Sequence, residues 1–397
     1  MVIGLRMRQA RLAAGLTLDE VVELLGGSIT KAGLSKYELS KSTPTAAFLA
    51  RLAPALGVRA SQFIEEPSVS VIWVAFRKHS RLPVREQARI QAFAERRIEL
   101  DLWLRSVLCP AQRPQIVPRL NVTTPSQAEV AAEQVRVSWK LGQGPIPAVT
   151  TLLEDRGAVV VAVAEPREFD GLSAWINEHI PAFVVNASMP PDRRRYDLAH
   201  ELGHLVTKNR LHDAKAEETL AHRFAAAFLV PADSARTELG AHRRTLDVQE
   251  LGLLKRKWGM SMQAWIRRAR DLEIIGPGQY QTLNVVFRSR GWHRSEPVPF
   301  EGEEEPKRFR LLAHRALAEG VVSEGWAEAA CPEAVPPKTG VEEPMYESLR
   351  LARLATHERH SILADAADAV AADYATDAEF ADWETADLDG AADDAAG

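Results

Sequence analysis

The hydrophobic and polar positions of the first 66 residues follow a helical period, in short runs separated by tight connections. The run LTLDEVVELLGG begins with Thr17 as an N-cap, and Glu20 stands in the capping-box position three residues later. In STPTAAFLARLAPALGV, Thr43 is a suitable cap and Pro44 suits the first helical position. Together with LRMRQARLAAG and TKAGLSKYEL, these runs predict an all-α domain over residues 1–66.

The pattern changes twice between residues 67 and 300. Residues 67–125 predict a helical connector, with a short strand in SVSVIWVAFRK and a helix in PVREQARIQAFAERRIELDLWLRSVL. Residues 126–300 predict a second unit, with β-branched strands in AVVVAVA and PAFVVNA and helices in SQAEVAAEQVRVSWKLG, IPAVTTLLEDRG, AEETLAHRFAAAFLVP and LDVQELGLLKRKWGMSMQAWIRRARDLEII. This order predicts an α+β fold with a small sheet and a helical majority.

The C-terminal part has a different composition. Residues 301–344 form a charged, proline-containing extension, and residues 345–397 form an Ala/Asp-rich acidic tail that we expect to be flexible or only partly helical. From Ser361 to Gly397 there are eleven Asp and Glu and no Lys or Arg, so residues 1–360 carry a net charge of +6 within a total of -5. The body of the protein is therefore mildly basic.

Length and composition limit the number of domains, the membrane association and the kind of metal ligand that can be expected. A chain of 397 residues has room for two or three domains. No apolar run approaches the roughly 20 residues that span a bilayer, so we expect a cytoplasmic protein without a membrane partner. The two cysteines, Cys109 and Cys331, are far apart and lack a C-x-x-C partner. Any metal ion must therefore be held by nitrogen and oxygen.

The segment RRRYDLAHELGHLVTKNR contains His200, Glu201 and His204 in the order H-E-x-x-H. Residues four apart lie on one face of a helix, so the two imidazoles can aim at one point. Glu201 falls beside that face, where its carboxylate can reach a metal-bound water and act as a general base. Uncharged neighbours on both sides are typical of a half-buried active-site helix. The motif therefore predicts a catalytic Zn²⁺ site.

Catalytic zinc usually takes a third protein ligand, and the next helix offers Glu217, Glu218 and His222. Glu218 is favoured over Glu217, because it shares a face with His222 and Glu217 points about 100° away around the helix. Tyr196 and His222 are candidates for stabilising the oxyanion of the reaction. The alternative is that Tyr196 packs and His222 orients a metal ligand.

The N-terminal segment from Arg6 to Val58 resembles the helix-turn-helix of the Xre and lambda-repressor family over nearly its whole length. The resemblance implies a double-stranded DNA partner and a recognition helix from Lys31 to Glu38. It further implies that bases or phosphates are contacted by Lys31, Ser35, Lys36 and Lys41. Ser40 stands where the family usually has Gly. Residues 1–66 hold eight Lys and Arg against six Asp and Glu, so a homodimer would strengthen a weak phosphate attraction.

The stretch from about Ser126 to Arg290 resembles the ImmA/IrrE family of zinc metallopeptidases, through several motifs in order that include FDGLSAW and EETLAHRFAAAFLVP. The resemblance implies a zincin-like fold with His200, His204 and Glu218 as zinc ligands and Glu201 as the base. Where the family commonly has Asn, this chain has His222. Members with this fusion are regulators in phage, mobile-element or stress circuits, and characterised relatives cleave a repressor protein.

Two functions follow as hypotheses. The first is a DNA-binding regulator with zinc-dependent endopeptidase activity that cleaves a repressor or toxin-like partner. The alternative is a transcriptional repressor or antitoxin-like binding protein whose metal domain is a non-catalytic sensor or scaffold. The intact motif argues for the first, because Glu201 is not a ligand and a non-catalytic site does not need it.

Overall fold

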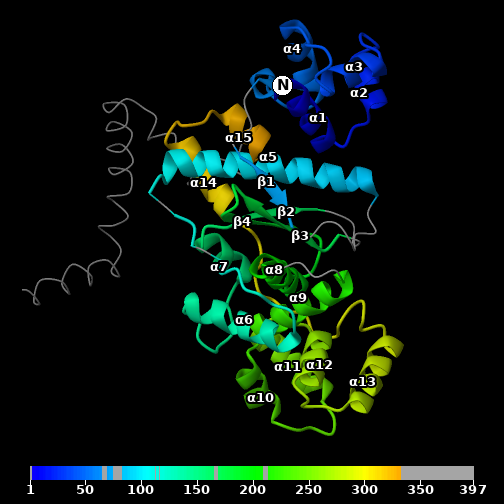
Figure 1. The fold of residues 1–397 in the computed structure, drawn as a ribbon, viewed down its shortest axis with the longest axis vertical. Helices are drawn as coiled ribbons and strands as arrows, with labels where there is room; N and C mark the ends of the chain where they lie inside the picture. Colours follow the sequence, from blue (N-terminus) through cyan, green and yellow to red (C-terminus); the bar gives the residue numbers. More distant parts are fainter. Residues whose placement is uncertain are drawn as a thin grey trace, which may run out of the picture. The chain divides into compact units, whose positions relative to one another are not determined.

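The computed structural model describes residues 2–64, 69–74, 83–111, 113–115, 117–164, 169–208 and 213–331 (Figure 1). The predictions for the acidic tail of residues 345–397, and for the end of the charged extension, lie outside these residues. Among the described residues, no helix is both long enough and apolar enough to cross a membrane. The predicted fold class is confirmed, with an all-helical N-terminal region followed by a helix-rich region around a small sheet.

The N-terminal region is built from short helices that share one apolar core. They are α1 (Val2–Ala13), α2 (Leu18–Leu24), α3 (Lys31–Glu38) and α4 (Ala46–Ala55), followed by the 3-10 turn η1 (Ala60–Phe63). Their apolar faces meet in a cluster that includes Met7, Val21, Leu34, Leu52 and Phe63, each nearly inaccessible to solvent. Burial of such side chains is the main force that holds short helices together, because isolated helices of this length are not stable.

The helix caps confirm one prediction and correct another. Thr17 and Glu20 form the predicted capping box at the start of α2. The prediction that Thr43 caps α4 and that Pro44 is its first residue was wrong. Thr45 is the N-cap, and its hydroxyl accepts a hydrogen bond from the amide of Phe48 at 3.2 Å. Both threonines can cap a helix equally well by residue type, so local sequence does not decide between them.

A four-stranded sheet lies at the centre of the second region, in the order β1-β3-β4-β2. Its strands are β1 (Val71–Trp73), β2 (Val159–Val163), β3 (Gly171–Ile176) and β4 (Ile180–Asn186). Strand β3 pairs antiparallel with β1 and β4, whereas β2 pairs parallel with β4. The sequence pattern predicted the other three strands but not β3, whose residues are buried from Leu172 to Ile176 and show no alternation of polar and apolar side chains.

Helices cover both faces of the sheet (Figure 1). On one face α5 (Val84–Leu108) packs Ile90, Ala94 and Ile98 against the odd-numbered positions of β2. On the other face α8 (Pro191–Val206) packs Leu198 and Leu202 against the core. The segment predicted as a connector therefore supplies both an edge strand and a covering helix of the sheet.

The remaining helices are α6 (Pro125–Ser138), α7 (Val149–Asp155), α9 (Ala214–Leu229), α10 (Ala232–Leu239), α11 (Val248–Trp258), α12 (Met262–Asp271), α13 (Pro277–Ser289), α14 (Arg308–Ala318) and α15 (Glu324–Ala330). Of these helices, α6, α7 and α9 pack against α8, α14 packs against α5, and α10, α11 and α13 pack against α12. Glu304, from the charged extension, is completely buried. Its carboxylate accepts hydrogen bonds from the amides of Val149 and Thr150 and lies 3.5 Å from Arg195 Nη1. The extension thus satisfies the open amides at the start of α7.

Helix α1 packs along α5 and joins the N-terminal region to the sheet (Figure 1). Arg6 Nη1 donates to both carboxylate oxygens of Glu99, at 2.7 and 2.8 Å, and both residues are buried. Next to this pair, Gln9 Nε2 donates to Glu95 Oε2 at 3.1 Å. The other oxygen of Glu95 accepts from Trp73 Nε1 in β1, also at 3.1 Å. A short polar chain therefore runs from α1 through α5 to the edge strand.

Candidate metal centre

Helix α8 brings the two histidines of the H-E-x-x-H motif together. Their Nε2 atoms lie 3.1 Å apart, and their rings meet edge to face with centroids 4.7 Å apart. The spacing of four residues places both rings on one side of α8, opposite the leucines that face the core. His204 is buried and His200 is half-buried, so neither ring lies fully exposed on the surface.

Helix α9 adds a carboxylate to the same point. Glu218 Oε2 lies 3.2 Å from His200 Nε2, and Glu218 Oε1 lies 3.5 Å from His204 Nε2. Glu217 belongs to neither cluster of metal-ligating groups found among the described residues. The two helices approach closely because α8 carries Gly203, where a Cβ would lie only 3.0 Å from Phe224 Cδ1 of α9.

The spacing of these three side chains suits a tetrahedral ion. Zinc bonds to nitrogen and oxygen of about 2.0–2.1 Å place tetrahedral ligands about 3.3 Å apart. The nitrogen and oxygen atoms of His200, His204 and Glu218 lie 3.1, 3.2 and 3.5 Å from one another. Two neutral imidazoles and one carboxylate are also a donor set that zinc accepts in catalytic sites. The residues present therefore fit a zinc ion.

Glu201 lies between the histidines and the sheet. Its side-chain oxygen lies within 4.8 Å of the ring nitrogens of His200 and His204. Ser173 Oγ, on β3, donates a hydrogen bond to Glu201 Oε2 at 2.6 Å, and Ser173 is completely buried. Sequence reasoning did not identify Ser173, because nothing in the sequence pairs a strand serine with a helix glutamate 28 positions later.

Tyr196 and His222 lie beside the cluster. Their rings stack with centroids 6.0 Å apart, and the His222 ring lies 4.3 Å from that of His200. The Tyr196 hydroxyl donates to the carbonyl oxygen of His222 at 3.3 Å, with His222 Nδ1 at 3.4 Å. Burial, and next the charge of Asp197, raise the pKa of Tyr196, so its phenol keeps its proton at neutral pH. The two rings therefore lie against the His200 side of the cluster.

One turn before the cluster, Asp197 forms an ion pair with Arg193. Arg193 Nε lies 3.2 Å from Asp197 Oδ1 and Arg193 Nη2 lies 3.0 Å from Asp170 Oδ1. Burial raises the pKa of Asp197 well above its ordinary value, and Arg193 opposes that rise. Arg193 is thus a counter-charge for a buried carboxyl on the turn of α8 that leads into the site.

A cavity of about 320 Å³ opens next to Tyr196 and His222. Its walls come from α8, α9, α12 and α13, and include Arg267 and Tyr280. Asp271, at its rim, forms ion pairs with Arg267 at 2.9 Å and with Arg223 at 3.2 Å. The cavity has both aromatic and charged walls.

The predicted DNA-contacting residues lie at or near α3. Lys31 is the first residue of α3, and its ammonium lies 2.6 Å from Asp19 in an exposed ion pair. Lys36 and Lys41 are exposed and Ser35 is half-buried. Ser40 follows α3 with a positive φ of 54°, which explains why glycine is the usual residue at this position. The structure thus places Lys31, Ser35 and Lys36 on α3 and Lys41 just after it.

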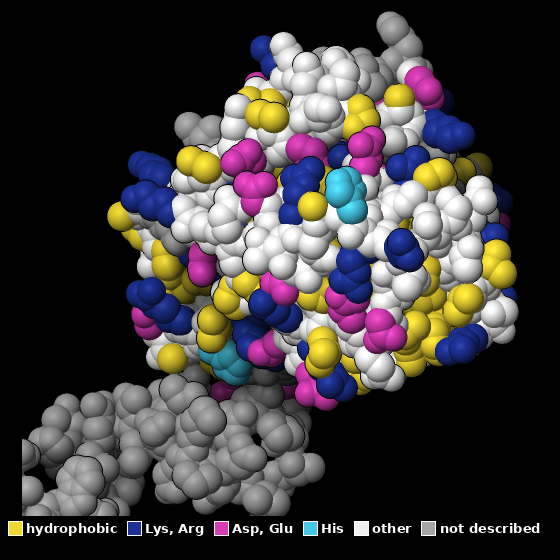
Figure 2. All heavy atoms as spheres, turned by 90° about the horizontal axis from the view of Figure 1, so that it is seen from below, with side chains coloured by type: hydrophobic (Ala, Val, Ile, Leu, Met, Phe, Trp, Pro, Cys, Tyr) yellow, Lys and Arg dark blue, Asp and Glu magenta, His cyan; other side chains and the backbone are white. Residues whose placement is uncertain are grey.

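Basic and acidic side chains are interspersed on the face seen in Figure 2, which lies below the view of Figure 1. That face shows no extended patch of a single charge. It offers no competing site for the phosphate backbone, which needs clustered Lys and Arg.

Comparison with known families agrees with this geometry. Residues 2–62 match a helix-turn-helix domain family, and residues 157–270 match the IrrE N-terminal-like domain family. The second match spans β2, β3, β4 and the helices from α8 to nearly the end of α12, and so includes α8 and α9, which carry the cluster. No curated protein matches the chain. The chain therefore carries a segment similar to a helix-turn-helix domain, followed by a segment similar to the IrrE N-terminal-like domain.

Proposed function

We propose that the protein is a DNA-binding regulator whose zinc-dependent endopeptidase cleaves a partner repressor or a toxin-like regulatory protein. The observation that carries the proposal is the convergence of His200, His204 and Glu218 at zinc spacing, with Glu201 beside them and fixed by Ser173. A site that only holds metal has no use for Glu201 in this position.

His200, His204 and Glu218 would hold the ion. A bound zinc ion supplies Lewis acidity and lowers the pKa of water toward about 7. Glu201 accepts a proton from the attacking water and returns it to the nitrogen of the leaving amine. Its hydrogen bond from Ser173 fixes one carboxylate oxygen toward the sheet, so the other oxygen is the one directed to the reacting water.

Tyr196 and His222 act as positioning residues in this proposal. The stacked pair lies against His200 and shares α8 and α9 with the ligands, so it restricts how far the two helices and the His200 ring can move. The cavity beside them receives a side chain of the substrate. Its mixed walls favour a substrate residue that is large enough to reach Tyr280 and polar enough to meet Arg267.

In this proposal the N-terminal domain binds DNA and so determines where the peptidase is located. In the proposal α3 enters the major groove, with Lys31, Ser35, Lys36 and Lys41 at bases or phosphates. Lys31 would exchange its exposed partner Asp19 for a phosphate, which costs little because an exposed ion pair is weak. A homodimer would double the number of phosphate contacts and so strengthen binding by a domain with few positive charges.

The function can be tested by co-expression with candidate substrates, chosen as any small repressor-like or toxin-like protein that a neighbouring gene encodes. Wild-type protein should cleave one of them, and Glu201→Gln should bind zinc at the wild-type level without cleaving. Cleavage by Glu201→Gln at the wild-type rate would refute the role of the base. Zinc binding and operator binding without any cleavage by the wild type would instead support the non-catalytic sensor or scaffold.

A further inference from the structure

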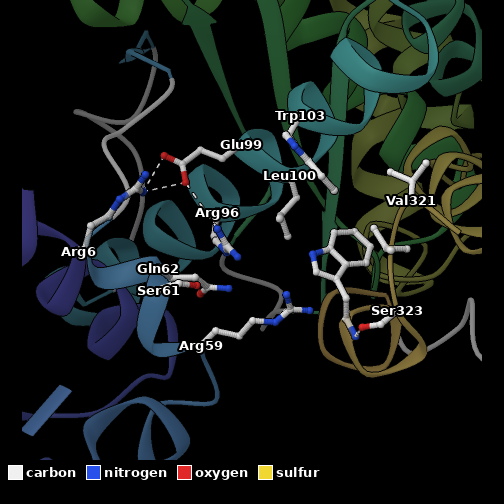
Figure 3. Close-up of a pocket in the computed structure, with 12 residues that line it drawn as sticks. Arg6, Arg59, Ser61, Gln62, Arg96, Glu99, Leu100, Trp103, Val321 and Ser323 are labelled. Atoms are coloured by element: carbon white, nitrogen blue, oxygen red, sulfur yellow. Dashed lines mark hydrogen bonds and ion pairs between the residues drawn. The ribbon is translucent and has the colours of Figure 1, made fainter. Parts of the chain in front are cut away.

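A second, larger cavity lies where the N-terminal domain meets α5 and α15 (Figure 3). None of the residues that line it belongs to the metal centre. Its volume is about 620 Å³, within the range of about 300–1,000 Å³ that small-molecule sites occupy. A neighbouring cavity of about 450 Å³ shares Arg59, Gln62, Arg96, Leu100 and Trp326 with it. The two form one cleft along this junction.

The charged residues of the cleft leave an excess of positive charge. Arg6, Arg59 and Arg96 line it, against the single carboxylate of Glu99. Glu99 is already engaged by Arg6 at 2.7 Å, and Arg96 Nη1 is a looser neighbour at 3.9 Å. Arg59 has no ion-pair partner within the part of the chain that the structure describes. In Figure 3, Arg59 and Arg96 extend from different elements toward the same hollow.

Aromatic rings form another wall. Trp103 of α5 and Trp326 of α15 lie with ring centroids 5.7 Å apart and planes inclined by 50°. Trp326 is buried, which fixes its ring, whereas Trp103 remains 41% exposed. A large aromatic side chain that stays exposed at the rim of a cavity is a ready surface for a flat ligand, and indole rings stack well on nucleobases.

From these walls we propose that the cleft binds a nucleotide. Arg59 and Arg96 meet the phosphate, since guanidinium groups present paired N–H donors that match phosphate oxygens. The base stacks on Trp103, and Gln62 and Ser61 offer amide and hydroxyl groups to polar atoms of the ligand. This site is separate from the metal centre and does not depend on the peptidase.

Such a ligand would touch two parts of the chain at once. Arg59 and Gln62 belong to the end of the N-terminal domain, while Arg96, Trp103 and Trp326 belong to the helices that cover the sheet. A nucleotide held by both would therefore stabilise the junction between them, because a ligand that binds only the joined state favours that state.

Isothermal titration of the full-length protein with AMP, GMP, CMP and UMP tests the proposal, with adenosine and inorganic phosphate as partial ligands. At least one nucleotide should bind, with adenosine and phosphate each weaker by about tenfold or more, because each lacks one of the two contacts. Arg59→Gln and Arg96→Gln should each weaken nucleotide binding by about tenfold, the loss expected for one charge-assisted hydrogen bond. Trp103→Leu should weaken the binding of the nucleotide but leave the binding of phosphate unchanged.

Arg113→Gln is the matched control, because Arg113 is also exposed but does not line the cleft. It should leave the affinity unchanged. Absence of heat with all four nucleotides at about 1 mM would overturn the proposal, since sites that use ionic and stacking contacts bind more tightly than that. Equal binding of phosphate and nucleotide, equal binding of adenosine and nucleotide, or unchanged affinity in Arg59→Gln would overturn it as well.

Discussion

Ser173 holds Glu201 by a buried hydrogen bond of 2.6 Å that crosses from the sheet to the H-E-x-x-H helix. Ser173 lies on β3 and Glu201 on α8, so the orientation of the proposed base depends on how α8 packs against the sheet.

Ser173→Ala should lower the rate of peptide cleavage by about tenfold, the cost of one hydrogen bond to a charged group, while zinc content stays at the wild-type level. The reduction should appear in kcat rather than in KM, because Ser173 is completely buried and out of reach of a substrate. Ser138→Ala is a suitable control, since Ser138 Oγ only bonds within its own helix. An unchanged kcat in Ser173→Ala would show that the contact does not orient the base.

Glu218→Gln and Glu217→Gln distinguish the two neighbouring carboxylates of α9. Loss of the charged oxygen at Glu218 should weaken zinc binding by more than about a hundredfold, because even groups that only orient metal ligands contribute 10- to 100-fold. The same change at Glu217 should have little effect, since Glu217 lies outside the cluster. Competition with a chelator of known affinity measures both. The reverse order would make Glu217 the third ligand.

Glu99→Ala should destabilise the protein by about 3–5 kcal/mol, because it leaves the buried guanidinium of Arg6 without its carboxylate. Urea unfolding, followed by circular dichroism, gives the free energy. Glu303→Gln removes the partner of Lys307 in an exposed pair and should cost less than about 1 kcal/mol. Equal effects of the two substitutions would show that α1 is not held to α5 by this ion pair.

Glu95→Gln should change the pH dependence of stability. Burial raises the pKa of Glu95 above its ordinary 4.5, so the folded protein binds this proton more tightly than the unfolded chain does. The wild type therefore loses stability from this group as pH rises from 4.5 through the raised value, and Glu95→Gln does not. The free energy of unfolding of the variant minus that of the wild type should therefore be larger at pH 7 than at pH 4.5, so the variant is relatively more stable at pH 7. A relative stability that is the same at both pH values would contradict the shift.

Much of the site could be predicted because its chemistry is local in sequence. His200 and His204 are placed by helical spacing, and Glu218 by the face that it shares with His222 on the next helix. Ser173 and Glu304 could not be found in this way, since each acts on a distant element only after the chain has folded. The same holds for β3, which is buried on both faces and so lacks the alternation that marks a half-exposed strand. The wrong cap of α4 shows a different limit, because Thr43 and Thr45 have the same chemistry.

The contact of α1 with α5 changes what DNA binding does for the proposed peptidase. A catalytic domain on a flexible linker reaches any protein within a radius that the linker length sets. Here Arg6 and Gln9 bind α5, and Trp73 of the edge strand bonds to the same helix. If α3 binds in the major groove of DNA as proposed, the direction in which the metal centre faces is then fixed relative to the DNA. Proteins bound at one position and orientation along the DNA would be cleaved, whereas equally close proteins on the opposite side of the double helix would be spared.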